Sequence, residues 1–482
     1  MTLEPRRRRL PAAVLAGFGA LAVPGLVEAL HVNHTGVGQV LIYPYYTTRA
    51  AGGGTGTAYY DSLVSIVNTT NETKAVKVRF REGKRSQEVL GFNLFLSPRD
   101  VWTGAVVRTA DGAKLVSSDT SCVVPNGLFS TAPANTLNVF SNFNYAAAPA
   151  DGGGATLDRT REGYLEVLDM AVVTNATAVA SAAHGVSGVP ANCAFFQAND
   201  QFPANHGLLP PSGGLKGSAT LVNAAAGTDY SYDAMALANW ATNTQFSRID
   251  SATPNLASGN VLTSTVVRDD GSSVVSQWIN GVDAVSAALM ARSLSNEFLL
   301  TQATSTGTDW VVTFPTKFAY LSNDPAGPSL TPGPFNANFT NGQSCDLAAF
   351  QYWNREEQTT GSAPLALCHG ANVVTFTGSN RLGSANPAAV DPTTIALTPT
   401  NRLGWAQLSF LQPPTAGQPR LQRLATVTAT VNGVAATGGA THAGLPALGF
   451  AIQDFDNGTV GAIRSTYGAI ARHRTQLLVT TP

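Results

Sequence analysis

The 482-residue sequence contains few charged side chains. Asp, Glu, Lys and Arg together make up 12% of the chain, against about 25% in an average soluble protein. Basic and acidic residues nearly balance, at a formal net charge of -1. This composition provides no basic face for nucleic acid or anionic lipid, so we expect no nucleic-acid partner.

Long apolar runs are also missing beyond the N-terminus. No downstream stretch approaches the about 18 consecutive apolar residues of a membrane-spanning helix, so we expect no transmembrane segment after the leader is removed. The chain has no convincing tandem repeat either, which argues against a solenoid or a propeller.

The sequence lacks the local signatures of several enzyme classes. It has no P-loop, no G-x-G-x-x-G and no H-E-x-x-H, which argues against nucleotide binding and zinc-protease activity. The segment nearest to a serine-hydrolase elbow, "HGVSGVP" at His184 to Pro190, lacks the required spacing and is typical of a loop. We assign no catalytic residue, no cofactor and no metal ligand. His31 and His34 lie close together, but a terminal segment lacks the second set of contacts that fixes metal ligands.

The N-terminus has the layout of a secretory signal peptide. Arg6 to Arg9 precede an apolar stretch, and Val27-Glu28-Ala29 supplies a small-residue cleavage pattern. The apolar part is interrupted by prolines and is shorter than the about 20 residues of a membrane anchor, so cleavage is favoured over anchoring. We predict a signal peptide over residues 1–29 and an exported protein that is extracellular, on the cell surface or in the periplasm.

The four cysteines are Cys122, Cys193, Cys345 and Cys368. An even number in an exported chain favours disulfides, and the spacing is that of neither a redox motif nor a zinc site. We expect nearest-neighbour pairing, Cys122 with Cys193 and Cys345 with Cys368. Sequence alone leaves three connectivities open.

The hydrophobic pattern predicts a mainly β fold built from antiparallel β-sandwich-like modules. In "KAVKVRF", the apolar residues Val76, Val78 and Phe80 alternate with Lys77 and basic neighbours, as in a strand with one buried and one wet face. "LGFNLFL" repeats this alternation. Asp-Gly at 270–271 and Asn-Gly at 432–433 and 457–458 predict hairpin turns.

Two short helices complete the expected elements. We predict one over 281–294, capped by Asn280, and one around 463–471. The expected domains are residues 30–215 with the first cysteine pair, 216–330 with hairpins and the first helix, and 331–482 with the second cysteine pair, either separate from or co-folded with 216–330.

The segment "TDWVVTFPTKFAYL", Thr308 to Leu321, is typical of a strand with Trp310 and the alternate residues after it on a core face. Pro315 has no N–H for a sheet, so we expect an edge strand or a bulge there. Lys317 beside this proline is one contact candidate. Tyr43 and Tyr45 are two others, because tyrosines stack on sugar rings, although an edge strand under a loop explains them equally simply.

One pair of carboxylates in the sequence is a candidate for acid and base catalysis. Glu166 and Asp169 are three residues apart in a strand-like segment, which places them on opposite faces, too divergent to act on one bond. We therefore interpret them as structural rather than catalytic.

Several segments together resemble a family of functionally uncharacterised exported proteins of Gram-negative bacteria, described as secreted or cell-surface proteins. They are "GVGQVLIYPYYTT", "IVNTTNETKAVKVRFREG", "EVLGFNLFLSPRDVWTGAVV", "REGYLEVLDMAVV", "TDWVVTFPTKFAYL" and "GLPALGFAIQ". The resemblance covers most of the chain after the leader. It implies a location in the cell envelope or outside the cell and assigns no site residue.

Two function hypotheses follow. The preferred one is an exported non-enzymatic surface, matrix or appendage protein that acts through protein or glycan contacts, with cell-envelope components, glycans or further copies of itself as partners. The alternative is a secreted carbohydrate-active or ester hydrolase whose site is assembled from dispersed residues. A concave site with two carboxylates about 5 to 10 Å apart, or with a Ser/His pair, would favour the enzyme. An exposed row of aromatic side chains would favour glycan binding.

Overall fold

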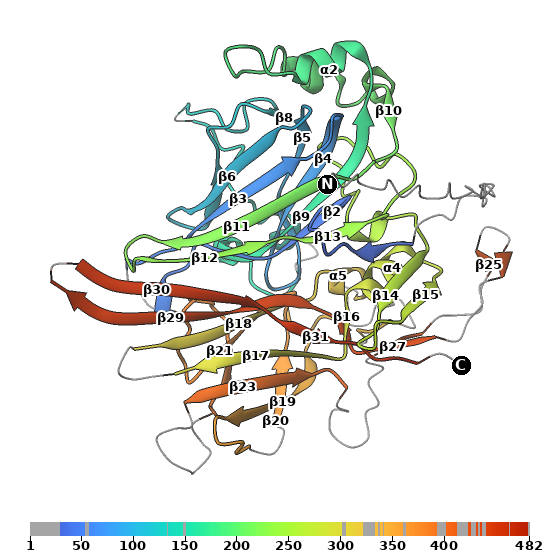
Figure 1. Ribbon diagram of the computed structural model, residues 1–482. Coiled ribbons are helices and arrows are strands. Elements are labelled where there is room, and N and C mark those ends of the chain that lie inside the picture. The colour runs from blue at the N-terminus through green and yellow to red at the C-terminus, as the bar shows by residue number, and fades with distance from the viewer. Residues whose placement is uncertain are drawn as a thin grey trace, which may run out of the picture.

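The computed structural model describes residues 29–480 except 54–56, 133, 148–150, 301–304, 322–332, 336–337, 341, 360–362, 393–401, 412–422, 426–429, 432–433, 436–439 and 462. The predicted signal peptide, apart from its last residue, and the predicted Asn432-Gly433 turn therefore lie outside the described residues. The described part folds into two antiparallel β-sandwiches joined side to side (Figure 1). The predicted mainly β, sandwich-like class is confirmed.

The first sandwich packs a large sheet against a smaller one. The large sheet has the order β1 (His31–Val32), β13 (Met235–Ala238), β2 (Val40–Thr47), β9 (Glu162–Val173), β4 (Thr73–Glu82), β5 (Glu88–Leu96) and β8 (Cys122–Val124), with β10 (Leu208–Leu209) also on β9. The smaller sheet has the order β12 (Thr228–Asp233), β11 (Leu215–Asn223), β3 (Asp61–Asn68), β6 (Val101–Arg108) and β7 (Ala113–Val116).

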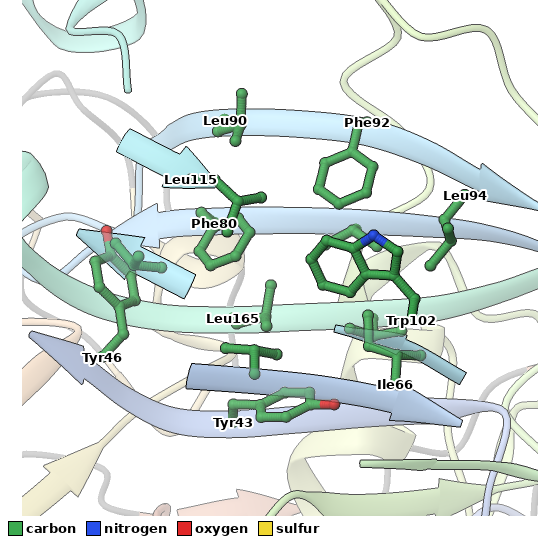
Figure 2. Packing of buried hydrophobic residues seen from close by; sticks show 14 of the residues in the cluster. Tyr43, Tyr46, Ile66, Phe80, Leu90, Phe92, Leu94, Trp102, Leu115 and Leu165 are labelled. Atoms are coloured by element: carbon green, nitrogen blue, oxygen red, sulfur yellow. The ribbon is translucent and has the colours of Figure 1, made fainter. Parts of the chain in front are cut away.

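Alternation along the strands builds the first core. Val76, Val78 and Phe80 of β4 all belong to the core between the two sheets, where Figure 2 shows Phe80. There they meet residues of β5 and of the opposite sheet, such as Phe92 and Trp102, whose ring centroids are 5.6 Å apart. Burying side chains of this size contributes about 1.5 to 3 kcal/mol each, so this layer is the main stabilising contact of the first sandwich.

The outer face of β4 is buried too, which corrects the prediction of a wet face. The Lys77 Nζ donates to the carbonyl oxygens of Arg248 and Ile249 at 3.0 and 3.1 Å. The Arg81 Nε lies 2.6 Å from Glu166 Oε1, with its guanidinium 4.2 Å from the Phe318 ring centroid. Alternation in one strand could not reveal that a distant part of the chain covers its polar side.

Glu166 and Asp169 form separate ion pairs, in agreement with the prediction that they face apart. Glu166 pairs with Arg81 on the outer face of β4, whereas Asp169 Oδ2 lies 3.1 Å from Lys74 Nζ at the end of the sandwich core. Both carboxylates are buried. Their role is to neutralise buried cations.

The second sandwich is built from strands that follow residue 290. One sheet has the order β20 (Ala363–Leu367), β19 (Asp346–Asn354), β23 (Leu403–Ser409), β17 (Ser293–Leu299) and β31 (Arg474–Gln476). We call it the tryptophan sheet. The facing sheet has the order β22 (Ala388–Val390), β21 (Ala371–Phe376), β18 (Gly307–Thr313), β29 (Leu448–Val460) and β30 (Ile463–Arg472).

Short elements link the sandwiches and cover their ends. Helices are α1 (Phe143–Ala146), α2 (Ala176–Ala182), α3 (Ala194–Asn199), α4 (Gly281–Ala288) and α5 (Lys317–Tyr320). The small sheets are β14 (Thr263–Val267) with β15 (Ser273–Gln277), β16 (Met290–Ala291) with β28 (Leu445–Pro446), β24 (Arg423–Ala425) with β27 (Thr441–Ala443) and β32 (Val479–Thr480), and β25 (Thr430–Val431) with β26 (Val434–Ala435). Within the described ranges, no helix is both long and apolar enough to cross a membrane.

Three element predictions are corrected. The helix predicted over 281–294 ends at Ala288, and the chain then enters β16 and β17. The helix predicted around 463–471 is strand β30, because its residues complete a ladder with β29. Asn457-Gly458 lies at an irregularity inside β29 rather than at a hairpin turn. By contrast, the Asp270-Gly271 turn joins β14 to β15 as predicted.

The strand predicted within Thr308 to Leu321 also differs from its prediction. β18 ends at Thr313 and lies between β21 and β29, so it is not an edge strand. Pro315 comes just after the strand, where no ladder needs its N–H. Trp310, Val312 and Phe314 do belong to the second core, as the alternation indicated.

The sheet order places the boundary between the sandwiches later than residue 215. β11 pairs with β3 and β12 pairs with β11, so residues 215–238 belong to the first sandwich. The strands of 290–313 and of 346–476 share both sheets of the second sandwich. Residues after 331 are therefore co-folded with the preceding segment.

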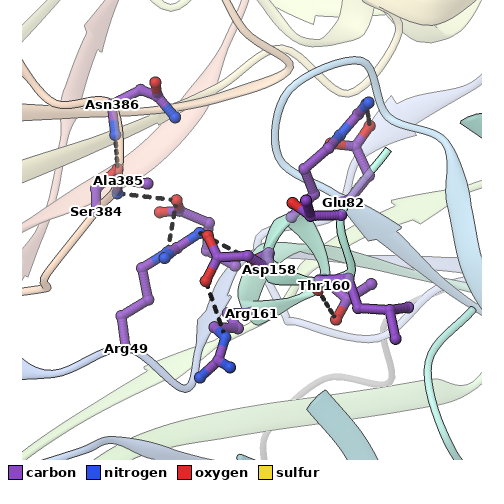
Figure 3. A network of polar contacts seen from close by, with 12 residues as sticks. Arg49, Glu82, Asp158, Thr160, Arg161, Ser384, Ala385 and Asn386 are labelled. Atoms are coloured by element: carbon purple, nitrogen blue, oxygen red, sulfur yellow. Dashed lines mark hydrogen bonds and ion pairs between the residues drawn. The ribbon is translucent and has the colours of Figure 1, made fainter. Parts of the chain in front are cut away.

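A buried carboxylate ties the two sandwiches together. Glu162 at the start of β9 accepts from the Arg49 Nε at 2.8 Å, from the Tyr45 hydroxyl at 2.8 Å and from the Ala385 backbone N–H at 3.1 Å. Figure 3 labels Arg49 and Ala385, the donors that reach this carboxylate from the two sandwiches. Ala385 belongs to the second sandwich. Each of these charge-assisted bonds stabilises by about 1.5 to 3 kcal/mol.

The disulfides are Cys122–Cys193 and Cys345–Cys368, which confirms the nearest-neighbour pairing. The first joins β8 to the residue before α3, and the second closes the base of the β19–β20 hairpin. Disulfides are typical of proteins that fold in an oxidising compartment.

A buried ion pair next to the second disulfide provides a stability test. Lys317 Nζ lies 2.7 Å from Asp346 Oδ2, and both side chains are almost fully buried. Lys317→Ala leaves the carboxylate without this partner, so we expect the free energy of unfolding to fall by about 3 to 5 kcal/mol, measured by urea denaturation. The control Arg355→Ala removes an exposed pair with Glu356 and should change stability by less than about 1 kcal/mol. Equal effects of the two substitutions would contradict this account.

Candidate functional site

The outer side of the tryptophan sheet carries aromatic and hydrogen-bonding side chains. In β19, Phe350 and Tyr352 point into the second core, so the intervening Gln351 and Trp353 point outward. In β23, Ala406 and Leu408 are core residues in the same way. The alternation places Trp405 and Gln407 on the outer side beside the β19 pair.

Strand register aligns these residues into two rows. Trp353 pairs with Trp405, which pairs with Glu297 of β17. In the neighbouring row, Gln351 pairs with Gln407 and Gln407 with Ser295, which pairs with Arg474 of β31. One face of the sheet thus presents two indole rings, amides, a carboxylate and a guanidinium within neighbouring positions.

The two indole rings stack on each other. Their centroids are 4.1 Å apart and their planes differ by 12°. Trp405 is nevertheless 42% exposed, because Trp353 covers only one of its two faces. The remaining ring surface is free for contact with another molecule.

A cleft of about 520 Å³ lies beside Trp405. It forms because β31 pairs only with Ser293 to Ser295, so the rest of the β17 edge lies open next to β29 and β30. β29 and β30 contribute three alanines, Ile470, Gln453 and Arg472 to the cleft, and β17 and β31 contribute polar residues. The lining is Ser295, Asn296, Glu297, Trp405, Ala451, Gln453, Ala469, Ile470, Ala471, Arg472 and Arg474.

Asn296 is held rigidly in this lining. Its Nδ2 donates to the Ala471 carbonyl at 2.9 Å and contacts His473 Nδ1 at 3.1 Å, while its Oδ1 accepts from the Glu297 N–H at 2.9 Å. His473 Nε2 lies 2.9 Å from the Val311 carbonyl oxygen, so Nε2 carries the proton and Nδ1 accepts from Asn296. Burial lowers the pKa of His473 to about 4, which keeps the ring neutral at physiological pH.

These groups suit a polyhydroxylated ligand. An aromatic face stacks on the apolar face of a sugar ring, while amides, a carboxylate and a guanidinium supply donors and acceptors for hydroxyl groups. A concave site with a few convergent polar groups is the usual form of a ligand pocket. The lining of the cleft is therefore chemically compatible with a sugar ring.

Hydrolysis of a glycosidic bond needs two carboxylates in one site. Glu297 is the carboxylate of this cleft. The described part of the chain has three further cavities. One is lined by no carboxylate, one by Asp269 alone and one by Asp233 alone. None of the four combines a pair.

Two Ser/His contacts lack the arrangement of a catalytic triad. Ser97 Oγ lies 3.2 Å and Asp100 Oδ2 3.7 Å from the same nitrogen of His184, Nδ1, whereas a triad needs them on opposite nitrogens. Ser276 Oγ lies 2.9 Å from His442 Nε2. Within the described residues, the other nitrogen of His442 has no partner, and both side chains are buried.

Comparisons with known proteins do not extend this picture. Family models, curated proteins and solved structures yielded no match. The resemblance to exported Gram-negative proteins therefore stays a prediction, and the site rests on its own geometry.

The contact candidates taken from the sequence lie in the interior, which corrects their interpretation as surface groups. Tyr43 is buried and its hydroxyl donates to the Ser65 carbonyl at 2.6 Å. Tyr45 is buried at the junction of the sandwiches, on Glu162. Lys317 is buried on Asp346. In each case a strand or helix from a distant part of the chain covers the residue.

His31 and His34 both line a cavity between the sandwiches. In the residues that the structure describes, no three His, Cys, Asp or Glu side chains are arranged to hold a metal ion. The sequence reading missed Trp353, Trp405 and Glu297. The sequence pattern could have indicated the two tryptophans, because each one alternates with core residues of its strand and so takes an outward-facing position.

Buried histidines predict an acid-sensitive fold. The pKa values of His369, His442 and His473 are lowered by burial from 6.5 to about 4. Between pH 6.5 and 4 these histidines bind protons in the unfolded chain but not in the folded one. The free energy of unfolding is therefore highest above pH 6.5 and falls as the pH drops towards 4. Thermal unfolding measured across this range should show the loss.

His473→Gln should make the loss of melting temperature between pH 6.5 and 4 smaller. The control His34→Gln, at an exposed position, should leave the dependence of melting temperature on pH unchanged. A melting temperature that stays constant from pH 6.5 to 4 would refute the prediction.

Proposed function

We propose that the protein is an exported, non-enzymatic surface, matrix or appendage component that binds glycans through the cleft beside Trp405. The observation that carries the proposal is a half-exposed indole ring, backed by a second indole and set in a cleft of hydrogen-bonding side chains. Glycan binding is the contact-based form of the function that this geometry supports best.

Several features support export. The leader over residues 1–29 has the charge and apolar order of a signal peptide. Two disulfides fit an oxidising compartment. A surface rich in small and hydroxylated residues and poor in charge fits the exterior of the cell.

The lining favours a glycan over a protein partner. Anchor sites for proteins are centred on fully desolvated apolar clusters. Here Trp405 is surrounded by Asn296, Glu297, Gln453 and Arg474, which match the dense hydroxyl groups of a sugar chain. The small side chains of Ala451, Ala469 and Ala471 leave the floor of the cleft open for a flat ring.

Trp405→Ala tests the proposal. The substitution removes the stacking surface from an exposed position, so we expect the fold to persist and the affinity for a bound glycan to fall at least about tenfold, or ~1.4 kcal/mol. The mature protein would be screened on a broad glycan array, and each hit quantified by affinity electrophoresis in the matching polysaccharide.

Tyr467→Ala is the matched control. Tyr467 is 49% exposed and stacks on Phe455 in the β29–β30 hairpin, but it does not line the cleft. Its removal should leave glycan affinity unchanged. The proposal fails if the array shows no bound glycan, or if the two variants lose affinity equally.

A further inference from the structure

A second cavity, of about 670 Å³, lies where the two sandwiches meet. Its walls come from the N-terminal strand β1, the β14–β15 hairpin, the end of α4 and the C-terminal strands, which Figure 1 shows gathered on one side of the molecule. The lining is His31, Val32, His34, Met235, Thr265, Val266, Val267, Asp269, Ala288, Leu289, Met290, Ala447, Arg472, Thr475 and Leu477, with Ala29, the last residue of the predicted leader, at its border.

Most of the cavity wall is apolar. Val266, Leu289 and Met290 are buried side chains that turn toward it, and Met235 and Leu477 are half-buried. Methionine side chains are flexible and polarizable, so Met235 and Met290 can adjust to the shape of a bound chain. A wall of this composition favours an aliphatic ligand.

The guanidinium of Arg472 lies at the wall of this apolar cavity. Arg472 Nη2 contacts Met235 Sδ at 2.7 Å. Among the described residues, Arg472 is in no ion pair. The Arg472 side chain is exposed, and the Asp233 carboxylate lies within electrostatic range of it. The guanidinium thus retains capacity for an anion.

The other polar groups of the cavity wall include two histidines and one carboxylate. His31 and His34 come from the N-terminal strand and the turn after it. Asp269 is the one carboxylate of the lining, and it lies in the loop of the β14–β15 hairpin rather than on the strands beside Arg472. The distribution is amphipathic, with an aliphatic body and a cationic wall.

We propose that this cavity binds a single-chain amphiphile with an anionic head, of the fatty-acid type, with the carboxylate on Arg472 and the chain among Val266, Leu289 and Met290. Its volume is within the roughly 300 to 1,000 Å³ of small-molecule sites. A guanidinium suits a carboxylate because both are planar and can share two hydrogen bonds. This site is separate from glycan binding and does not depend on it.

Isothermal titration of the mature protein with decanoate, below its micelle concentration, tests the proposal. 1-Decanol provides the chain without the charge, and acetate provides the charge without the chain. We expect one decanoate per chain, at least about tenfold weaker binding of decanol, and no measurable binding of acetate. Arg472→Gln should lower decanoate affinity to the decanol level.

A second variant separates loss of the cavity from loss of the fold. Thr265→Trp places a large ring in the cavity from half-exposed strand β14 and should abolish decanoate binding. Ile279→Trp, at a position that is 46% exposed and outside the lining, is the control and should bind like the unmodified protein. Circular dichroism would verify that both variants fold.

The proposal is overturned if decanoate does not bind, if decanol binds equally well, or if folded Thr265→Trp binds decanoate with unchanged affinity. Glycan affinity of Thr265→Trp should stay at its original value, because Thr265 does not line the cleft beside Trp405. Since Arg472 borders both spaces, the Thr265 variant is the one that distinguishes the two sites.

Discussion

The basic side chains on the outer face of β4 set the main constraint on this fold. A buried cation is costly unless acceptors surround it, and Lys77, Arg79 and Arg81 are all buried. Their acceptors come from separate parts of the chain: the carbonyls of residues 248–254, the carboxylate of Glu166 and the ring of Phe318. The segments that supply them must therefore be in place together, and this requirement joins the second sandwich to the first.

The same junction gives the candidate site its shape. The β29–β30 hairpin packs against the first sandwich, where Phe450 lies 4.8 Å from the Tyr232 ring and Thr466 donates to the Ala226 carbonyl at 2.7 Å. β31 pairs with only part of β17 and leaves the rest of that strand edge uncovered. The hairpin, fixed against the first sandwich, lies next to this uncovered edge. The cleft is the space between a strand edge and a hairpin that is fixed from the other side.

Local patterns in the sequence were sufficient for the class of fold and for much of its core. Val76, Val78 and Phe80 are core residues, as alternation indicated, and the expected nearest-neighbour pairing, one of three open connectivities, is the one observed. Predictions failed where distant segments decide the outcome. Residues 463–471 have a helical spacing of apolar side chains, but pairing with β29 makes them a strand.

The candidate site depended on such distant pairing throughout. The alternation of β19 and β23 marks Trp353 and Trp405 as outward-facing, and this much is readable from sequence. Their stacking follows from a register between strands about fifty residues apart in the chain, which no local pattern contains. Tyr43 and Tyr45 looked equally suitable as aromatic contacts, and only the covering strands distinguish them.

The second disulfide has a mechanical consequence for the strand that carries Trp353. Cys345 and Cys368 flank the open end of the β19–β20 hairpin, and β19 carries Trp353. Tension applied at the paired indoles is transmitted into this hairpin. Because the covalent link locks the two strand ends together, the hairpin cannot unzip from its base under load. A pulling force must instead shear whole strands, which breaks many hydrogen bonds at once rather than one after another.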